Sequence, residues 1–394
     1  MPAPWISAGG DGVTSADVPS LTGFTVAITA SRRVDEFATM LRRRGADVVT
    51  AAAIHMVPLA DDARLRAATE DVIATPPDVL IATTGIGFRG WVEAAGSWGL
   101  AEELLDALRS ARVISRGPKA TGALRTAGLR EEWSPASESS EEVLAHLSAE
   151  NLVGKRIAVQ LHGVTDDWNP VPGFPDMLAE RGATLVAVPV YRWEPPADPA
   201  ELDGLIERVA RDGVDAVTFT SAPAAASFLM RANELQLTDA VIGALTTSVT
   251  PFCVGPVTAR PLDNIGVASV QPGRMRLGAL ARVVADELPC RKPDLAVAGH
   301  RLGVHAACAV VDGEVRDLSP NSLTLLKALA RVPGAVVSRD VLLEALGGDD
   351  PHVVEAAVNR LRSALGAKVL IATVVKRGYR LAVEYMPDDT DANA

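Results

Sequence analysis

The chain has 394 residues, 48% of them hydrophobic and 22% charged, which is typical of globular protein and long enough for two or three domains. Three widely spaced cysteines exclude a disulfide framework and show no zinc-ligand spacing, and no run of eighteen apolar residues is present to span a membrane. No signal-peptide pattern follows Met1. A cytoplasmic protein without a metal site is therefore expected.

The net charge of −11 is unevenly distributed along the chain. Residues 1–300 carry a net charge of −10 and residues 301–394 carry −1, yet the segment 355–380 has six basic residues and one acidic residue. The acidic body argues against wholesale nucleic-acid binding, whereas a local basic patch is sufficient for DNA contact. A disordered N-terminus is expected over 1–19 and an acidic, disordered tail over 387–394.

The first 290 residues contain an internal repeat. Arg44-Gly-Ala-Asp-Val-Val recurs 137 residues later as Arg181-Gly-Ala-Thr-Leu-Val, and Asp78-Val-Leu-Ile recurs at the same offset as Asp215-Ala-Val-Thr. Two further pairs keep the same order: Leu21-Thr-Gly with Leu152-Val-Gly, and Gly117-Pro118 with Gly255-Pro256. A period this long indicates a duplicated domain rather than a solenoid.

Each half alternates short apolar runs, as at Val26–Thr29 and Val79–Ala82, with amphipathic stretches such as Phe37–Arg44. Gly45 and Gly182 are expected to end helices as C-terminal caps. Such alternation predicts parallel sheets covered by helices, with ligands beyond the carboxyl ends of the strands.

Two segments containing Val-Pro occupy equivalent places in the two halves. They are His55-Met-Val-Pro58-Leu and Val188-Pro189-Val-Tyr191-Arg-Trp193. Because proline is tolerated mainly on exposed or edge strands, both are expected to be extended strands between domains.

This pattern resembles the uroporphyrinogen-III synthase family over about residues 20–286. The matching motifs are Thr29-Ala-Ser-Arg-Arg33, Thr83-Thr84, Pro189-Val-Tyr191-Arg192, Thr220-Ser221 and Gly255-Pro-Val-Thr258-Ala259. The resemblance implies two α/β lobes joined by a two-stranded ladder, one lobe formed by 20–54 and 192–286 and the other by 58–188. It also implies a cleft between the lobes that binds a linear tetrapyrrole bearing eight carboxylates, without a cofactor.

Strand-end hydroxyls and free amides at helix N-termini suit such carboxylates, although these hydroxyls also serve as helix caps. The candidate ligand-binding residues are Arg32, Arg33, Thr84, Lys119, Thr220, Ser221, Gly255 and Thr258, joined by Arg192, Arg260 and Arg274 if these also line the cleft. In an active synthase the resemblance makes Tyr191 and Thr258 catalytic, with Tyr191 as proton donor. Tyr191 is otherwise a packing residue. Ala120 replaces threonine at the first-half equivalent of Thr258, which argues against turnover.

A linker is expected over 287–293, followed by a separate domain over 294–386. Short alternating segments and the turn at Asp312-Gly313 predict a small antiparallel sheet. Three helices follow, opening at Ser319, Ser338 and Asp350, and then a hairpin over 369–383.

The third of these helices has two distinct faces. One is an apolar stripe of Val354, Val358, Leu361 and Leu365. The other face and the hairpin hold the candidate DNA-binding residues His352, Ala356, Asn359, Arg360, Arg362, Lys376, Arg377 and Arg380. Arginine and asparagine are the side chains that read guanine and adenine, so the pattern is that of a recognition helix. The alternative is an amphipathic helix with a solvated polar face.

The domain resembles the winged-helix output domains of OmpR/PhoB-type response regulators over about 294–385. The matching motifs are Leu318-Ser-Pro, Pro333-Gly-Ala-Val-Val-Ser-Arg-Asp340, Val358-Asn-Arg-Leu-Arg362 and Gly378-Tyr379-Arg380. The resemblance places Asn359 and Arg360 in the major groove, Arg362 on phosphate and the wing in the minor groove. Val375 stands where that family has an arginine. The resemblance also implies that the protein binds promoter or operator DNA as a dimer.

The combination predicts a DNA-binding regulator whose synthase-like part senses a tetrapyrrole-like or other anionic small molecule. RNA polymerase or a second regulator is a further expected partner. Binding to a membrane is not expected. Fusions that resemble this one regulate nitrate and nitrite assimilation in actinobacteria, which implies such target genes. The alternatives are an active uroporphyrinogen-III synthase with a regulatory DNA-binding tail and a bifunctional protein.

Overall fold

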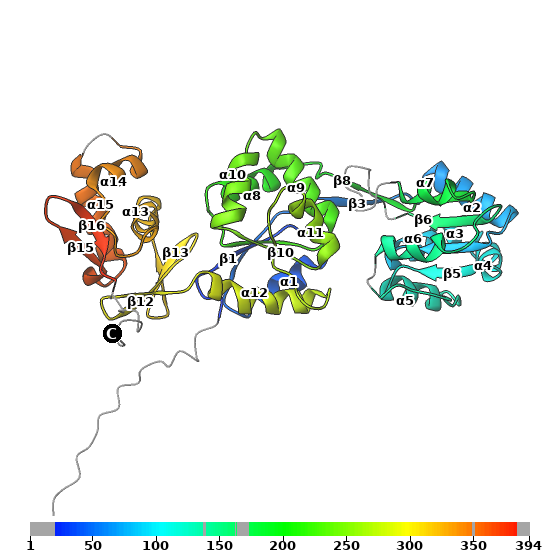
Figure 1. Ribbon diagram of the computed structural model, residues 1–394, viewed down its shortest axis with the longest axis horizontal. Coiled ribbons are helices and arrows are strands. Elements are labelled where there is room, and N and C mark those ends of the chain that lie inside the picture. Colours follow the sequence, from blue (N-terminus) through cyan, green and yellow to red (C-terminus); the bar gives the residue numbers. More distant parts are fainter. Residues whose placement is uncertain (1–19, 137–138, 162, 164–172, 349–350, 384–394) are drawn as a thin grey trace, which may run out of the picture.

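Three bodies lie in a row along the molecule: the C-terminal domain, a first α/β lobe and a second α/β lobe (Figure 1). This computed structural model describes residues 20–136, 139–161, 163, 173–348 and 351–383. The expected disordered segments, 1–19 and 387–394, lie outside the described residues. No helix in the described part of the chain is long and apolar enough to cross a membrane.

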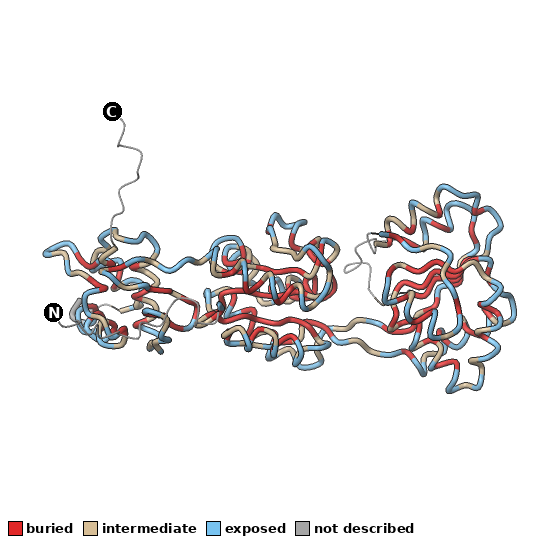
Figure 2. Tube along the Cα trace, turned by 90° about the horizontal axis from the view of Figure 1, so that it is seen from below, coloured by how far each residue is buried: buried red, intermediate tan, exposed pale blue. Residues whose placement is uncertain are grey.

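The first lobe is a parallel sheet in the order β10-β9-β1-β2. Its strands are β1 (Thr25–Ile28), β2 (Asp47–Thr50), β9 (Ala216–Phe219) and β10 (Thr250–Cys253). Its helices are α1 (Val34–Arg42), α8 (Ala200–Ala210), α9 (Ala222–Glu234), α10 (Thr238–Thr247), α11 (Pro256–Asp263) and α12 (Leu277–Arg291). The central strands β1 and β9 are buried along their whole length, since one core cluster covers each face of the sheet (Figure 2).

The second lobe repeats this design with the strand order β5-β4-β6-β7, again all parallel. Its strands are β4 (Val79–Ala82), β5 (Arg112–Ser115), β6 (Arg156–Gln160) and β7 (Thr184–Val188). Its helices are α2 (Ala63–Ala74), α3 (Gly85–Ser97), α4 (Ala101–Arg109), α5 (Pro118–Thr126), α6 (Ser140–Ser148) and α7 (Phe174–Ala179). Gly45 and Gly182 end α1 and α7 with positive φ angles of 93° and 86°, as predicted.

A two-stranded antiparallel ladder connects the lobes. It pairs β3 (His55–Pro58) with β8 (Tyr191–Glu194), and Val57 lies opposite Arg192. The chain therefore crosses between the lobes twice, which confirms the predicted architecture of duplicated lobes joined by a ladder. The second predicted segment is shorter than expected, because Val188 belongs to β7 of the second lobe.

The C-terminal domain begins with an antiparallel sheet in the order β11-β12-β13-β14. Its elements are β11 (Leu295–Val297), β12 (His300–Val304), β13 (Cys308–Val311), β14 (Glu314–Asp317), α13 (Pro320–Ala330), α14 (Arg339–Leu346), α15 (Pro351–Ala364), a 3₁₀ turn (Lys368–Leu370), β15 (Ile371–Val374) and β16 (Gly378–Leu381). The Ser319 and Ser338 side chains accept hydrogen bonds at the starts of α13 and α14. This is the predicted winged helix.

The segment 287–293, expected to be a linker, has a different structure. Helix α12 continues through Pro289 to Arg291, because Ala285 and Leu288 are buried against the first lobe and hold its last turns in place. Only residues 292–294 separate α12 from β11. The C-terminal domain is therefore connected to the first lobe by a short segment.

Candidate functional site

A cleft of about 1710 Å³ lies between the two lobes. It is lined by residues that follow the carboxyl ends of strands from both sheets, such as Ala30 after β1, Thr83 after β4 and Thr220 after β9. Carboxyl ends of parallel strands are the usual place for a ligand, because helix N-termini begin there. Of the predicted ligand-binding residues, those that line the cleft are Arg32, Arg33, Thr84, Lys119, Thr220, Ser221 and Thr258.

The cleft is strongly cationic although the chain as a whole is acidic. Its lining includes two acidic residues, Glu141 and Asp286, and eight basic ones: Arg32, Arg33, Arg89, Arg116, Lys119, Arg274, Arg276 and Arg282. The sequence did not single out Arg89, Arg116, Arg276 or Arg282. Arg116 directly precedes the repeated Gly-Pro motif, which was a usable signal. A polyanion is the ligand class that this lining attracts.

Four helix N-termini add to the positive potential of the cleft. Thr84 and Ser221 cap α3 and α9, accepting hydrogen bonds from Gly87 N at 3.1 Å and from Ala224 N at 3.4 Å. Gly255 is not itself a lining residue, but it begins α11 as its N-cap without a capping side chain. Gly117 does the same for α5. Pro118 and Pro256, the first residues of α5 and α11, have no N–H, so the N–H groups that follow them in the first turns supply a partial positive charge toward the cleft.

Tyr191 lies at the start of the ladder strand β8 and faces the cleft. Its side chain is buried, and its hydroxyl lies 3.3 Å from Thr84 Oγ1. Burial raises the pKa of Tyr191 above its ordinary value, while Thr84, Arg116 and Arg32 act in the opposite direction. The phenol therefore keeps its proton at neutral pH and is able to donate it or a hydrogen bond.

Position 120 distinguishes the two halves of the cleft. Thr258 is buried and lines the cleft in the first lobe, whereas its repeat equivalent in the second lobe is Ala120. The neighbouring Thr121 hydroxyl bonds instead to Ser115 Oγ at 2.6 Å, within its own lobe. One of two symmetry-related hydroxyls is thus missing from the cleft.

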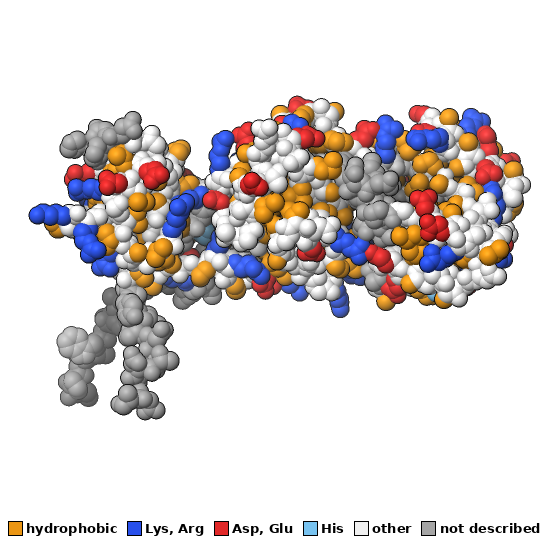
Figure 3. Space-filling view, turned by 45° about the horizontal axis from the view of Figure 1, so that its top comes forward, with side chains coloured by type: hydrophobic (Ala, Val, Ile, Leu, Met, Phe, Trp, Pro, Cys, Tyr) orange, Lys and Arg blue, Asp and Glu red, His pale blue; other side chains and the backbone are white. Residues whose placement is uncertain are grey.

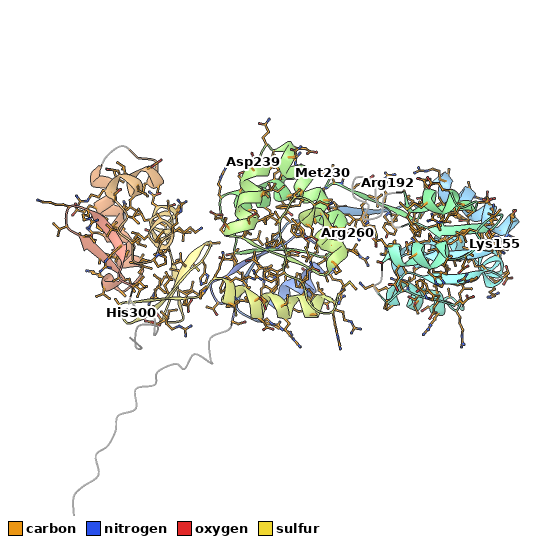
Figure 4. All side chains as sticks on the ribbon, viewed as in Figure 1. Lys155, Arg192, Met230, Asp239, Arg260 and His300 are labelled. Atoms are coloured by element: carbon orange, nitrogen blue, oxygen red, sulfur yellow. The ribbon has the colours of Figure 1, made fainter. Side chains whose placement is uncertain are left out.

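Arg192 and Arg260 were expected at the cleft if it bound a polyanion, but neither is a lining residue. The Arg192 guanidinium pairs with Glu194 on the ladder. Arg260, on α11 of the first lobe, pairs with Glu141 on α6 of the second lobe, and Figure 4 shows it at the edge that faces the second lobe. The Arg260–Glu141 pair therefore joins the two lobes beside the cleft, which Glu141 lines.

Helix α15 supplies a second candidate surface. Val354, Val358, Leu361 and Leu365 are fully buried in the core of the C-terminal domain. The opposite face exposes the predicted DNA-binding residues Ala356, Asn359 and Arg360. His352 belongs to the same helix, but its side chain lies outside the described part of the structure. Small and hydrogen-bonding side chains thus share the exposed face.

The wing follows α15 as the hairpin β15–β16. Val375 is 78% exposed at its tip, and Lys376 adopts a positive φ of 61° beside it. Lys376, Arg377 and Arg380 are all exposed, as a DNA-contacting wing requires. Figure 3 shows lysine and arginine side chains at this end of the molecule.

Arg362, which was predicted to contact phosphate, makes hydrogen bonds within the C-terminal domain. Its guanidinium donates to the Ile371 carbonyl oxygen from Nε at 3.1 Å and from Nη2 at 2.7 Å, and from Nη2 to Thr373 Oγ1 at 2.9 Å. It also lies 5.8 Å from the centre of the Tyr379 ring. Arg362 therefore connects α15 to both strands of the wing.

Comparisons with known proteins cover both parts of the chain. Residues 35–282 match the family model described as "Uroporphyrinogen-III synthase HemD". The chain belongs to this family. The uncharacterized protein YjjA of Bacillus subtilis is 30% identical over 264 residues, which cover 66% of this chain and 94% of YjjA. The crystal structure of a mutant uroporphyrinogen III synthase from Thermus thermophilus has a TM-score of 0.55 and 28% identity, covering 68% of this chain and 99% of that one.

Residues 313–381 of this HemD-family protein match a second model, "Transcriptional regulatory protein, C terminal". The transcriptional regulatory protein CutR of Streptomyces coelicolor is 37% identical over 110 residues, which cover 27% of this chain and 49% of CutR. The protein therefore joins a HemD-like domain to an OmpR/PhoB-type winged-helix DNA-binding domain. It is a DNA-binding transcriptional regulator with a HemD-like domain.

Proposed function

We propose that the protein is a ligand-responsive transcription factor in which α15 reads an operator and the cleft between the lobes binds an anionic small molecule. The two faces of α15 carry this proposal. Val358 and Leu361 anchor the helix in the core, while Asn359 and Arg360 are exposed between them. Side chains of this kind recognise base edges in the major groove through paired hydrogen bonds.

The ligand class follows from the chemistry of the cleft. Eight basic and two acidic side chains line it, and two helix N-termini with uncapped amides adjoin it. A ligand with several carboxylates, such as a tetrapyrrole, would match these donors in number and spread. Filling the cleft would favour one arrangement of the lobes, and DNA binding would change with it.

The target genes that we propose are those of nitrate and nitrite assimilation. Nitrite reductase uses sirohaem, which is made from uroporphyrinogen III, so a tetrapyrrole-sensing regulator would match cofactor supply to enzyme synthesis. We expect the protein to bind direct-repeat half-sites as a pair, with the wing of each copy in the adjacent minor groove.

The first test is a salt titration of binding to labelled DNA from the region upstream of the protein's own gene, with unrelated DNA as competitor. Arg360→Ala should weaken specific binding by about 1–3 kcal/mol, roughly 5- to 150-fold, because a paired contact to a base is lost. Arg109→Ala removes an exposed arginine from the second lobe and is the matched control. Weak binding that is equal on any DNA and unchanged in Arg360→Ala would refute the regulator.

A second candidate function is catalysis by the cleft itself. The observation that favours it is Tyr191, a buried phenol beside Thr84 in a cationic cleft. Purified protein should then cyclise hydroxymethylbilane, and Tyr191→Phe should slow this reaction without affecting operator affinity. Absence of any cyclisation by the wild type would eliminate this candidate and leave the regulator unaffected.

A further inference from the structure

The C-terminal domain rests on the amino ends of the first lobe's strands, through contacts that centre on Asp215. The Asp215 side chain is fully buried at the start of β9. It accepts hydrogen bonds from Thr25 N in the lobe at 2.9 Å and from Ala306 N, between β12 and β13, at 3.0 Å. Lys292 Nζ, just beyond α12, lies 2.8 Å from the same carboxylate. One buried group therefore joins both bodies and the segment that connects them.

Close apolar packing surrounds this charge. The Phe24 ring, before β1, lies 4.2 Å from the His305 ring, and Cys308 Sγ donates to the Gly23 carbonyl oxygen at 3.3 Å. Gly23 has a φ of +83°, and a Cβ atom added to it would lie 2.5 Å from Val310 Cγ2. The lobe and the winged helix are therefore in contact without space for even one extra methyl group at this point.

The contacts of Asp215 with Ala306 and Lys292 form a joint between the first lobe and the winged helix. Helix α13 extends this joint toward the recognition helix. Lys327 Nζ donates to the carbonyl oxygens of Asp212 in the lobe and of Ala306 in the winged helix, at 2.9 Å each. Burial lowers the pKa of Lys327, while the negative charges of the nearby Asp215 and Asp212 raise it. Helix α13 also packs on the recognition helix α15. The contacts of Lys327 therefore connect the helix that supports α15 to the first lobe.

The internal duplication provides a control within the same chain. Asp78 is the repeat equivalent of Asp215 and accepts a hydrogen bond from Arg156 N at 2.8 Å, just as Asp215 accepts one from Thr25 N. Its side chain is nevertheless 43% exposed, and its cationic partner is Lys155, the repeat equivalent of Phe24. Lys155 lies at the far end of the second lobe, where the described part of the chain places no further domain over the sheet (Figure 4). The apolar Phe24 and the extra partners of Asp215 are therefore particular to the docked lobe.

The surface that reads DNA lies on the far side of the winged helix. The lobe is contacted by the turn at 305–308 and by α13, and both lie between the lobe and the hairpin β15–β16 (Figure 1). Helix α15 packs on α13 with its apolar face, so its exposed face points away from the docking contacts. Docking therefore leaves the DNA-reading surface open.

We propose that the winged helix is permanently docked on the first lobe, and that the two move as one body whether or not the cleft is occupied. Regulation then acts through the position of the second lobe relative to this unit, and not through release of the winged helix. This consequence rests on the proposed function, whereas the docking itself does not depend on any ligand.

The test measures distances between spin labels in the full-length chain, with Cys290, the exposed cysteine of the described residues, replaced by serine. One label replaces Asn264 in the first lobe and the other replaces Val332 in the winged helix, both of which are exposed. We expect one narrow distance distribution, identical with and without operator DNA. Asp215→Asn should lower the docking equilibrium by at least about 100-fold, since it disrupts a buried charged pair, and should broaden the distribution. Asp78→Asn, the matched control, should leave it narrow.

Lys327→Met serves as a second variant in case Asp215→Asn does not fold, and it should also broaden the distribution while the circular dichroism stays native. A broad distribution in the wild type, or a distance that changes when operator DNA binds, would overturn permanent docking. Narrow distributions in folded Asp215→Asn and Lys327→Met would overturn the role of this joint. Arg360→Ala should change operator affinity without changing the distance between the labels. Operator affinity therefore reports on DNA recognition, and the label distance reports on docking.

Discussion

Arg362 on α15 and Ile371 on β15 are joined by two hydrogen bonds from one guanidinium to one carbonyl oxygen, at 3.1 and 2.7 Å. The contact fixes the angle between the recognition helix and the wing. In the proposed function both elements enter neighbouring grooves of the same duplex, so DNA binding would depend on this angle.

Replacing Arg362 should therefore reduce both stability and DNA affinity. Arg362→Ala leaves the Ile371 carbonyl without its side-chain donor and should lower the free energy of unfolding by about 1–3 kcal/mol. Arg362→Lys should recover part of the loss, since an ammonium donates but cannot form the forked contact. Denaturant unfolding and operator titration measure the two effects. Arg360→Ala is the control that should lose affinity alone, and an unchanged unfolding midpoint in Arg362→Ala would contradict this role.

The wing should contribute to binding mainly through phosphate contacts. Lys376→Ala and Arg377→Ala should each weaken binding about equally on all sequences, and each should reduce the slope of log K against log salt by roughly 0.9. Lys155→Ala, at the opposite end of the molecule, should leave the slope unchanged. A wing substitution that relaxes sequence preference without changing the slope would show that the wing reads bases instead.

Much of the architecture could be predicted from the sequence, because the residues that begin and end helices lie next to those helices in the chain. Helix-ending glycines such as Gly45 and Gly182 lie beside the helices that they end, and the serine caps of α13 and α14 lie at the helix starts. The internal repeat indicated a duplicated domain, and the family resemblance supplied the two lobes and the ladder that joins them. The predicted cleft residues came from positions that directly follow strands, and for that reason most of them lie together.

The remaining site residues depend on contacts that no local pattern encodes. Arg276 and Arg282 reach the cleft because α12 passes along it, more than 200 residues from Arg32 in the sequence. The Arg260–Glu141 pair joins different lobes, and the joint at Asp215 joins groups that are 77, 91 and 190 residues away. The linker prediction was wrong for the same reason: proline and charges indicated a break, but burial of Leu288 extended the helix.

His305 should make the joint sensitive to acid. Burial lowers the pKa of His305 from its ordinary value near 6.5; Lys292 acts in the same direction, and Asp215 and Asp294 oppose it. The folded state then binds fewer protons than the unfolded state just below the ordinary value, so stability is lost as the pH falls from about 6.5 toward the lowered folded value. His305→Gln should flatten this part of the curve of unfolding free energy against pH. Phe88→Leu loosens packing in the core of the second lobe, leaves the surroundings of His305 intact and removes no titratable group, so it should keep the wild-type slope.

The Arg260–Glu141 pair should bias the lobes toward closure only weakly. Both side chains are about 40% exposed, and exposed pairs contribute about 0–1 kcal/mol, so Glu141→Gln should shift the open-to-closed ratio by no more than about fivefold. The readout is the distance between labels at Asn264 in the first lobe and Glu102 in the second lobe. Raising the salt concentration to about 1 M should reproduce the effect in the wild type, since the Debye length falls to about 3 Å. Glu103→Gln, which removes an exposed charge from α4 of the second lobe, should change nothing. If Glu141→Gln instead separates the lobes completely, the pair is the main closing contact, and a ligand in the cleft would have to compete with it rather than add to it.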